Sequence, residues 1–544
     1  MFSLLSSIAI TNTIYLILGK LFTKTNTNNL RNFSEIAIDG FIYLSLIALI
    51  INFFIPLDVK INTLILTIIC FFFLYKKKSF QKNELLILII VVLFCFFLIL
   101  LDTVNRPDAG LYHLPFIKIL NEEKIIFGLA NLHSRFGHIS IIQYSSAINN
   151  NIFNGDIGIL IPLISIYSFL VFYFLGDILN FLTNNNKKKY NFLSLIFSSF
   201  ILIYISYKIN RYGEFGNDAI GHLIYFYLLS KLINYKKFDY LKFNKIYLLS
   251  VFAILNKFTL IFSILVPIYI FFKNRISIKK AALSIPTLII ILWILRNIIT
   301  SGCIIYPQIN TCFTDLKWSD EKAIVHIGET SEAWAKDWPN RMDKNLSLKK
   351  YSQDFNWLNT WKNNHFKNKI IKILIPYLIL LFLIYLYLKF NLKKKHFFKL
   401  NFHNYNLPLY TSLIGCLFFF LKFPIYRYGY SYLISSIVMY LIFLIKFYDL
   451  TKIRRLGFFV IFIFILSFVY KQTDRYIEFY KVRSLVPEIY NIQKQHKTIL
   501  LNDGGFYNLS LNGSCMYDVN LCTLFRNDIL SIHKRGSYKF FEVK

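Results

Sequence analysis

Uninterrupted apolar runs long enough to cross a lipid bilayer constrain the fold of this chain more than any other feature. One run, LLILIIVVLFCFFLILL, ends at Leu101, and another, IGILIPLISIYSFLVFYFL, begins at Ile157. A membrane-spanning helix needs about 20 mostly apolar residues. Hydrophobic residues make up 56% of the chain, whereas soluble domains contain about 45–50%. The runs are continuous and do not alternate with polar residues, as strands of a β-barrel would. The sequence therefore predicts an all-α polytopic membrane protein.

The net charge of +32 is distributed in the same pattern. Lys and Arg gather in short loops between apolar runs, as at Lys76–Lys78, which is where the positive-inside rule places cytoplasmic loops. This distribution argues against nucleic acid as a partner and for a lipid bilayer. Applied along the chain, the rule puts the C-terminal tail and four other segments outside, namely those containing Asp102, Glu214, Thr300 and Arg427.

The order of the runs predicts six parts. They are N-terminal membrane helices at 1–101, a first extracytoplasmic catalytic loop at 102–157, central membrane helices at 158–300, a long extracytoplasmic loop at 301–368, C-terminal membrane helices at 369–470 and a small extracytoplasmic tail at 471–544. The run Ile246–Phe272 has basic residues on both sides, so both of its ends belong on the cytoplasmic side. We expect two short helices there, hinged near Asn256 and Lys257.

Four of the seven cysteines lie close together in pairs in the predicted outer segments. Cys303 and Cys312 belong to GCIIYPQINTC, and Cys515 and Cys522 to CMYDVNLC. Oxidising compartments favour disulfides, so we predict the bonds Cys303–Cys312 and Cys515–Cys522. A zinc site made of all four is the alternative, but neither pair has the two-residue gap common in structural zinc sites. No dedicated metal ligands are predicted elsewhere.

The polar segment from Asp102 to Gln143 separates the two runs quoted above. It is too long for a simple connection of about 4–6 residues, and its apolar spacing predicts two short helices on the membrane surface. Asp108, at the membrane exit, is a candidate general base. Taken alone, the residue fits a helix cap better, and the polar residues that share its loop are what favour a site. Candidates for substrate or phosphate binding in the same loop are Arg106, Tyr112, His113, His133, Arg135 and His138. For the last three the alternative is solvated surface.

The outer loop RYGEFGND supplies two further carboxylates. Glu214 and Asp218 are candidates for a second acidic group in the site. The alternative is that Asp218 caps the following helix and Glu214 is solvated. His222, one helical turn after Asp218, is expected to face the same way.

Three cations stand at or inside apolar runs, and each suits a phosphate. Lys257 interrupts a run, where a Lys costs about 2.5–3.5 kcal/mol, which a bound phosphate would offset; the alternative is that its amine reaches the cytoplasmic surface. Arg296 ends a run on the outer side, Arg427 lies in the outer turn FPIYRYG, and Arg binds phosphate through its bidentate fork. Tyr428 beside Arg427 suits sugar stacking. Both arginines could instead anchor at the interface.

The stretches RPDAGLYHLP, RNIITSGCIIYP and RYGY resemble the GT-C superfamily of polytopic glycosyltransferases, over about residues 102–432. The resemblance implies a GT-C-like helical bundle of about 12–14 membrane segments, with extracytoplasmic loops that carry short surface helices. It makes Asp108 the essential Asp of the first outer loop. Many members have a second acidic residue beside it; here position 109 is Ala. A divalent cation stays open as a cofactor.

The resemblance further implies the activity. The chain would move a sugar from a polyprenyl-phosphate donor to a glycan, lipid or protein acceptor, with inversion, on the outer face of a bacterial inner (cytoplasmic) membrane. Asp108 would deprotonate the acceptor, and Arg427 with Lys257 or Arg296 would hold the lipid phosphate. The Trp-rich loop 300–368 would cover the sugar. The alternatives are a transporter or flippase for a lipid-linked glycan, with charges near the midplane, and a glycan polymerase or ligase.

Overall fold

The chain is mostly helical. The computed structural model describes residues 1–23, 29–102, 107–138, 140–183, 189–209, 212–213, 215, 218–235, 237–391, 405–445, 454–481, 484–491, 493, 495–501, 503–527 and 529–543. Five helical stretches in this part are long and apolar enough to cross a membrane: Phe2–Phe22, Leu30–Asn52, Lys82–Ile99, Gly155–Thr183 and Leu358–Leu386. Shorter apolar helices are Val59–Tyr75, Leu193–Lys208, Phe258–Lys273, Ile285–Ser301 and Asn406–Lys422. The prediction of apolar, membrane-length helices is confirmed.

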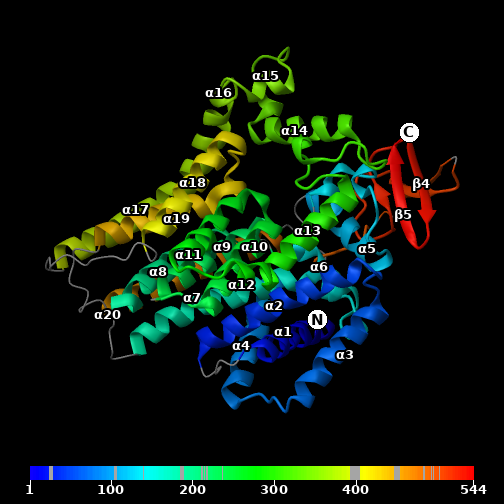
Figure 1. Cartoon of the computed structure of the whole chain (residues 1–544). Coiled ribbons are helices and arrows are strands. Elements are labelled where there is room, and N and C mark those ends of the chain that lie inside the picture. Colours follow the sequence, from blue (N-terminus) through cyan, green and yellow to red (C-terminus); the bar gives the residue numbers. More distant parts are fainter. Residues whose placement is uncertain are drawn as a thin grey trace.

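Four helices form the N-terminal part of the bundle, drawn in blue in Figure 1. They are α1 (Phe2–Phe22), α2 (Leu30–Asn52), α3 (Val59–Tyr75) and α4 (Lys82–Ile99). Two glycines let α1 and α2 touch through their backbones. A Cβ atom on Gly40 would lie 1.7 Å from the carbonyl oxygen of Tyr15, and one on Gly19 would lie 2.0 Å from that of Ile36. Small residues serve the same purpose where helices meet in lipid.

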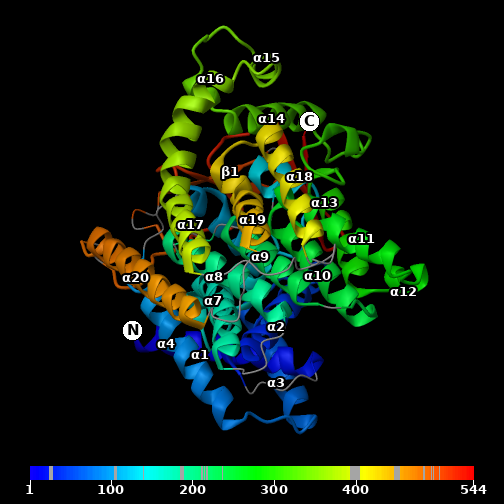
Figure 2. The ribbon, with the colours of Figure 1, turned by 90° about the vertical axis from the view of Figure 1, so that its left-hand side faces the viewer.

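The centre of the molecule is a group of helices that pack on one another in sequence order. They are α7 (Ile161–Thr183), α8 (Lys189–Lys208), α9 (Asp218–Asn234) and α10 (Tyr240–Asn256). Every residue of α9 from Ile220 to Ile233 is buried. Four later helices pack against this centre (Figure 2): α17 (Lys372–Asn391), α18 (Asn406–Lys422), α19 (Tyr426–Ile445) and α20 (Arg454–Phe479). The α18 and α19 helices contact α9, α20 contacts α8, and α17 contacts α19. The α9 helix is therefore buried among its neighbours.

The apolar run 246–272 folds back on itself, as predicted. The α10 helix ends at Asn256, Lys257 is extended, and the chain returns through η5 (Phe258–Ile264) and α11 (Leu265–Lys273). The two arms meet at Ser250 and Ser263, whose hydroxyls lie 3.2 and 3.3 Å from each other's carbonyl oxygens. At the far end the Tyr240 hydroxyl donates to the carbonyl of Lys280 (3.1 Å), just within α12 (Ile278–Ala282). The run is a helical hairpin with Lys257 at its tip.

The first polar loop contains the two expected short helices, α5 (Leu114–Glu122) and α6 (Ile141–Ile148). Short irregular turns connect them to their neighbours: η1 (Ala109–His113), η2 (Leu129–Asn131), η3 (Ser134–Gly137) and η4 (Gly155–Leu160). All of α6 and most of α5 are buried. Both helices are thus packed inside protein and do not lie on an open surface.

The long loop begins after α13 (Ile285–Ser301) and is built of short helices. They are η6 (Ile309–Thr311), α14 (Glu321–Ala335), η7 (Trp338–Asn340), α15 (Leu348–Ser352), α16 (Leu358–Trp361) and η8 (Lys362–Ile371). Its tryptophans pack the loop onto the rest of the molecule. Trp357 and Trp361 contact the ring of Phe420, and the Trp361 indole donates to the carbonyl of Pro424 (2.7 Å). That the loop covers a sugar stays a prediction.

The tail is where the all-α prediction is wrong. After α20, which ends at Phe479 and so runs past the predicted boundary at 470, come five strands: β1 (His496–Leu500), β2 (Phe506–Ser510), β3 (Cys522–Thr523), β4 (Leu530–Arg535) and β5 (Tyr538–Val543). They form a β1-β2-β3 sheet and a β4-β5 hairpin. The hairpin joins the first loop, because the Phe127 N–H donates to Lys539 and its carbonyl accepts from Phe541 (3.0 and 2.9 Å). The tail is therefore attached to the first loop and is not a separate appendage.

Both predicted cysteine pairs are at bonding distance. The Sγ–Sγ distance is 2.02 Å for Cys303–Cys312 and 2.06 Å for Cys515–Cys522. The first bond closes the turn that follows α13, and the second closes a loop of the tail. Both predicted pairings are confirmed.

Candidate functional site

Four charged side chains that the sequence singled out lie in direct contact, and we call Asp108, Asp218, Lys257 and Arg427 the charge quartet. Arg427 Nη1 lies 3.5 Å from Asp108 Oδ2, and Arg427 Nε lies 3.8 Å from Asp218 Oδ2. The Lys257 amine is bonded to the other oxygen of Asp218. The quartet joins four parts of the chain: the first loop, the start of α9, the tip of the hairpin and the start of α19.

Asp108 does not cap a helix. Its backbone is already helical (φ −49°, ψ −34°), and its carboxylate makes no capping hydrogen bond to η1. The carboxylate instead faces Arg427, and about a third of each side chain is exposed, 34% for Asp108 and 36% for Arg427. An N-cap would have used the carboxylate to bind backbone N–H groups of the first turn. The geometry thus leaves Asp108 open to a ligand that approaches Arg427.

Lys257 reaches the quartet because the hairpin turns at that residue. It has extended backbone angles (φ −146°, ψ 106°), which end α10 and direct the side chain away from the helix. The amine lies 4.0 Å from the centre of the Tyr428 ring. The Thr259 hydroxyl donates to the carbonyl of Tyr428 (2.9 Å), which ties the hairpin tip to α19. Lys257 therefore points into the quartet and not to the basic end of the hairpin.

The His222 ring binds the backbone of Arg427. The Nε2 atom of His222 lies 3.0 Å from the carbonyl oxygen of Arg427, and Nδ1 lies 2.7 Å from the hydroxyl of Ser431. Because a carbonyl only accepts, Nε2 carries the proton, and Nδ1 accepts from Ser431. On its other side, Arg427 Nη2 donates to the Tyr428 hydroxyl (3.2 Å). His222 positions the arginine backbone, while Tyr428 orients the guanidinium.

His113 and Tyr112 line the loop side of the quartet. Gln143 accepts the N–H of Ser140 through Oε1 (3.0 Å), so its amide NH₂ is the donor to His113 Nδ1 (2.8 Å). The proton of His113 is therefore on Nε2. Burial lowers the pKa of His113 to about 4, so this ring is neutral near pH 7. Burial and the nearby Asp108 carboxylate raise the pKa of the Tyr112 phenol, which makes Tyr112 a hydrogen-bond donor to that carboxylate.

The other loop candidates lie next to Tyr112: the Arg135 guanidinium is 6.0 Å and the His133 ring 6.3 Å from the centre of its ring. Burial, with the charge of Arg135, lowers the pKa of His133 to about 4, and its Nδ1 accepts the N–H of Arg135 (3.1 Å). Arg296 is buried and donates to the carbonyl of Phe136 (3.2 Å). Burial, with the charges of Arg135, Lys257 and Arg296, lowers the pKa of His138 to about 3. Arg296 thus supports the fold of the first loop rather than joining the quartet.

Two predicted site residues, Arg106 and Glu214, lie outside the described residues. Of the others, Tyr112, His113, Asp218, Lys257, Arg427 and Tyr428 gather around Asp108. His133, Arg135, His138, His222 and Arg296 lie behind or beside this group. The roles of all these residues stay predictions, but the proximity that those roles require is present.

A family described as a domain of unknown function, DUF8201, matches residues 1–434. The chain belongs to this family. No curated protein and no solved structure matches the chain. The DUF8201 match includes all four residues of the charge quartet and ends before α20 and the tail. The quartet is therefore part of the region that defines the family.

Sequence reasoning missed two residues that shape this DUF8201 site. The buried carboxylate of Asp102 accepts the N–H groups of Tyr212 and Gly213 (2.6 and 2.5 Å), which joins the end of α4 to the loop before α9. The sequence did indicate Asp102, because a single carboxylate directly after an apolar run is costly and therefore uncommon. Gln143 fixes the His113 tautomer, and its place in a Ser-x-x-Gln capping box was readable from the sequence.

The quartet does not fit a divalent cation. The guanidinium of Arg427 contacts both Asp108 and Asp218, so a cation already lies between the two carboxylates. Among the described residues, no group of three or more His, Cys, Asp or Glu side chains is placed to hold a metal ion. A Mg²⁺ or Ca²⁺ site would need several oxygen ligands at one point. No catalytic step is therefore assigned to a metal ion.

Proposed function

We propose that this chain is an inverting membrane glycosyltransferase that moves a sugar from a polyprenyl-phosphate donor to a hydroxyl acceptor on the extracytoplasmic face. The observation that carries this proposal is the open contact between Asp108 and Arg427, with Arg427 Nη1 3.5 Å from Asp108 Oδ2. A carboxylate that accepts a proton and a guanidinium that binds phosphate are the two groups such a transfer needs. Asp218 lies beside both of the cations that would bind phosphate: it is paired with Lys257 and lies 3.8 Å from Arg427.

In this proposal the transfer is a single displacement. The acceptor oxygen forms a bond to the anomeric carbon, and its proton passes to the Asp108 carboxylate. The bond between that carbon and the phosphate oxygen breaks, and polyprenyl phosphate leaves with the electron pair. Arg427 and Lys257 stabilise the charge that develops on the departing phosphate. Binding of that phosphate would draw the Arg427 fork away from Asp108 and free the carboxylate for the acceptor.

The two carboxylates differ in their contacts, and this difference assigns their roles. Asp218 is bonded to Lys257 and also lies 3.8 Å from Arg427, so both cations are oriented by it. Asp108 has one cation, at 3.5 Å, and an exposed edge. A general base must reach the acceptor hydroxyl. Asp108 meets this requirement, and Asp218 serves to position the two cations.

A transporter or flippase for a lipid-linked glycan is the second candidate, because the hairpin breaks at a charged residue. The position of the charges argues against it. The α10 arm has 17 residues, which corresponds to about 26 Å, and Lys257 lies at its end. The quartet therefore lies at one end of the bundle and not near its middle, where transporters place their sites.

A detergent assay separates the two functions, since a transporter has no compartments to connect in detergent. Purified protein would be incubated with synthetic polyprenyl-phosphate hexoses and pentoses and with alkyl glycosides as acceptors, and products identified by mass spectrometry. We expect glycosylated acceptor and free polyprenyl phosphate in equal amounts. Arg427→Gln should lower kcat by about 10²-fold or more, and Lys471→Ala, at an exposed ion pair, should not. Donor translocation by vesicles without any transfer in detergent would contradict the proposal.

A further inference from the structure

The backbone next to Asp108 is held by the tail. The carbonyl of Gly110, two residues after Asp108, accepts the N–H groups of both Cys515 (3.0 Å) and Met516 (2.9 Å). A carbonyl oxygen has two lone pairs, and here both are used by the same loop. The tail thus fixes the η1 turn at the point where it presents Asp108.

The side chains of the tail loop occupy the space beside Gly110. A Cβ atom there would lie 2.3 Å from Ser514 Oγ and 2.5 Å from Met516 Sδ. Both distances are far below ordinary contact, so with any other residue at position 110 the Ser514 and Met516 side chains would have to move. Glycine at this position therefore lets both side chains pack directly against η1.

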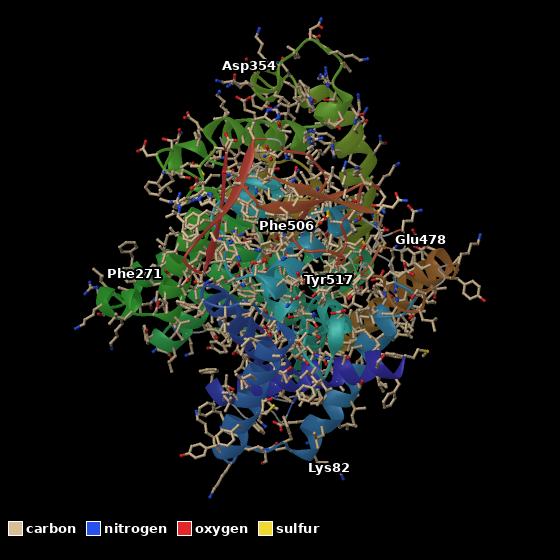
Figure 3. All side chains as sticks on the ribbon, turned by 90° about the vertical axis from the view of Figure 1, so that its right-hand side faces the viewer. Lys82, Phe271, Asp354, Glu478, Phe506 and Tyr517 are labelled. Carbon is tan, nitrogen blue, oxygen red and sulfur yellow. A yellow bond between two sulfur atoms is a disulfide. The ribbon has the colours of Figure 1, made fainter. Side chains whose placement is uncertain are left out.

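The same tail loop continues along α5. The Tyr517 hydroxyl donates to Asn121 Oδ1 (2.9 Å) and accepts from Asn150 Nδ2 (2.8 Å), and Asn520 Nδ2 donates to Glu123 Oε1 (2.9 Å). Figure 3 shows Tyr517 near the middle of this face of the molecule. One short loop therefore forms hydrogen bonds to both η1 and the C-terminal end of α5.

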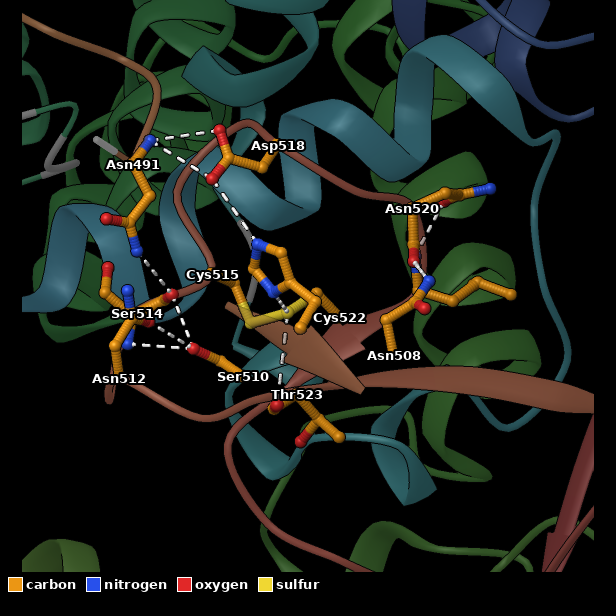
Figure 4. Close-up of a disulfide and its surroundings, with 12 residues drawn as sticks. Asn491, Asn508, Ser510, Asn512, Ser514, Cys515, Asp518, Asn520, Cys522 and Thr523 are labelled. Carbon is orange, nitrogen blue, oxygen red and sulfur yellow. Dashed lines mark hydrogen bonds and ion pairs between the residues drawn. A yellow bond between two sulfur atoms is a disulfide. The ribbon is translucent and has the colours of Figure 1, made fainter. Parts of the chain in front are cut away.

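The Cys515–Cys522 disulfide closes this loop at its two ends. Further bonds fix the loop to its flanks: both oxygens of Asp518 accept the N–H of Asn491 (3.0 and 3.1 Å), and just before the loop the Ser510 hydroxyl donates to the carbonyl of Ser514 (2.6 Å), as Figure 4 shows. Both cysteines are fully buried. The disulfide and these bonds together hold the contacts of the loop with η1 and α5 as one unit.

We propose that the disulfide-closed loop Cys515–Cys522 is a positioning element for Asp108. It holds η1 so that the carboxylate faces Arg427, and without it the turn would be free to move. The loop lies beyond residues 1–434, so the family region receives this support from a segment outside it. That Asp108 is catalytic rests on the proposed function; that the loop orders the turn does not.

Hydrogen–deuterium exchange of the full-length protein in detergent tests this positioning. In Cys515→Ser/Cys522→Ser, peptides covering 107–113 should exchange about tenfold faster or more, because the two bonds to Gly110 weaken. The matched control Cys303→Ser/Cys312→Ser removes the other outer disulfide and should leave these peptides unchanged. Gly110→Ala keeps the bond, disturbs the same contact from the other side, and should also speed exchange there. Unchanged exchange at 107–113 in Gly110→Ala and in any folded Cys515→Ser/Cys522→Ser would overturn the proposal.

Kinetics separate positioning from general destabilisation. Gly110→Ala should lower kcat for sugar transfer and leave KM for the donor near its wild-type value, because the phosphate ligands Arg427 and Lys257 lie on other elements. A rise in donor KM with unchanged kcat would contradict the assigned role. If the wild-type protein transfers no sugar, the proposed function fails, and the exchange experiment still decides whether the loop orders the turn.

Discussion

At the scale of single residues, the arrangement around Asp108 depends on which groups are charged. Arg427 lies between two carboxylates, and Lys257 pairs with one of them. The histidines beside them are buried, and for His113 burial lowers the pKa to about 4. The sequence identified His113 as a ligand candidate, and the structure shows a neutral ring whose Nδ1 accepts from Gln143. In the proposed function the charged side chains, and not His113, therefore carry out the proton transfer and bind the phosphate.

The lowered pKa of His113 predicts how the free energy of unfolding depends on pH. Its pKa is 6.5 when unfolded and about 4 when folded, so between these values the unfolded chain binds more protons. The free energy of unfolding should fall as pH drops from about 6.5 to 4, by up to about 3 kcal/mol from this residue. Thermal unfolding from pH 7.5 to 4.5 should show a smaller loss in His113→Asn than in wild type. His326→Asn, on an exposed face of α14, should match wild type, and equal losses in all three proteins would refute the prediction.

At the scale of elements, the hairpin of α10, η5 and α11 explains how Lys257 reaches the site. Basic residues at both ends of one apolar run indicated the turn, because no single span can have both ends in the cytoplasm. The bond from Tyr240 to Lys280 confirms that the two ends meet. The sequence contained no comparable pattern for the contacts between the tail and the first loop. The contact of Phe127 with the β4-β5 hairpin and that of Gly110 with Met516 join residues far apart in sequence, and local periodicity contains no information about such pairs.

The hairpin makes a prediction about sidedness. Lys242→Cys and Lys279→Cys, at its two open ends, should react with a membrane-impermeant maleimide from the same face of intact and inverted vesicles. Lys77→Cys should label from that face too, and Lys344→Cys from the opposite one, because the predicted loops lie on opposite sides. Labelling of Lys242→Cys and Lys279→Cys from different faces would rule out the hairpin.

At the scale of the whole molecule, a second set of charges lies among the helices at the end far from Asp108. The ion pairs are Arg31–Asp177 (2.7 Å), Lys231–Glu35 and Lys245–Asp39. They connect α2 with α7, α9 and α10, and three cations face three carboxylates. These charges hold the N-terminal helices on the centre of the bundle.

Breaking one of these pairs should destabilise the whole bundle. Asp177 also accepts from Ser194 and Ser198 (2.5 and 2.9 Å), so Asp177→Asn removes the charge that these groups and Arg31 share. Loss of one partner of a buried pair costs about 3 kcal/mol or more, and Tm in detergent should fall clearly. Asp474→Asn, at an exposed pair, should change Tm little. An equal effect of the two substitutions would show that the network is not structural.

The sequence identified all four members of the quartet, because charges in or beside apolar runs are rare and costly. It did not identify which of them meet, since that depends on the packing of η1, α9, α10 and α19. Arg296 shows the limit of such reasoning. Like Arg427, it is an arginine beside an apolar run on the predicted outer side, yet it donates to the carbonyl of Phe136 and supports a loop.

The most direct test of the central claim is sugar transfer by Asp108→Asn. Asn keeps the size of the side chain but cannot take a proton, and general base catalysis is worth about 10²–10⁴-fold. The assay is transfer from a polyprenyl-phosphate sugar by purified protein, with Tm recorded alongside and Asp315→Asn, an exposed carboxylate of the long loop, as the control. We expect Asp108→Asn to lose at least about 10²-fold in kcat with wild-type Tm and Asp315→Asn to remain fully active. A stable Asp108→Asn protein that transfers sugar at the wild-type rate would contradict the assignment of Asp108 as the base.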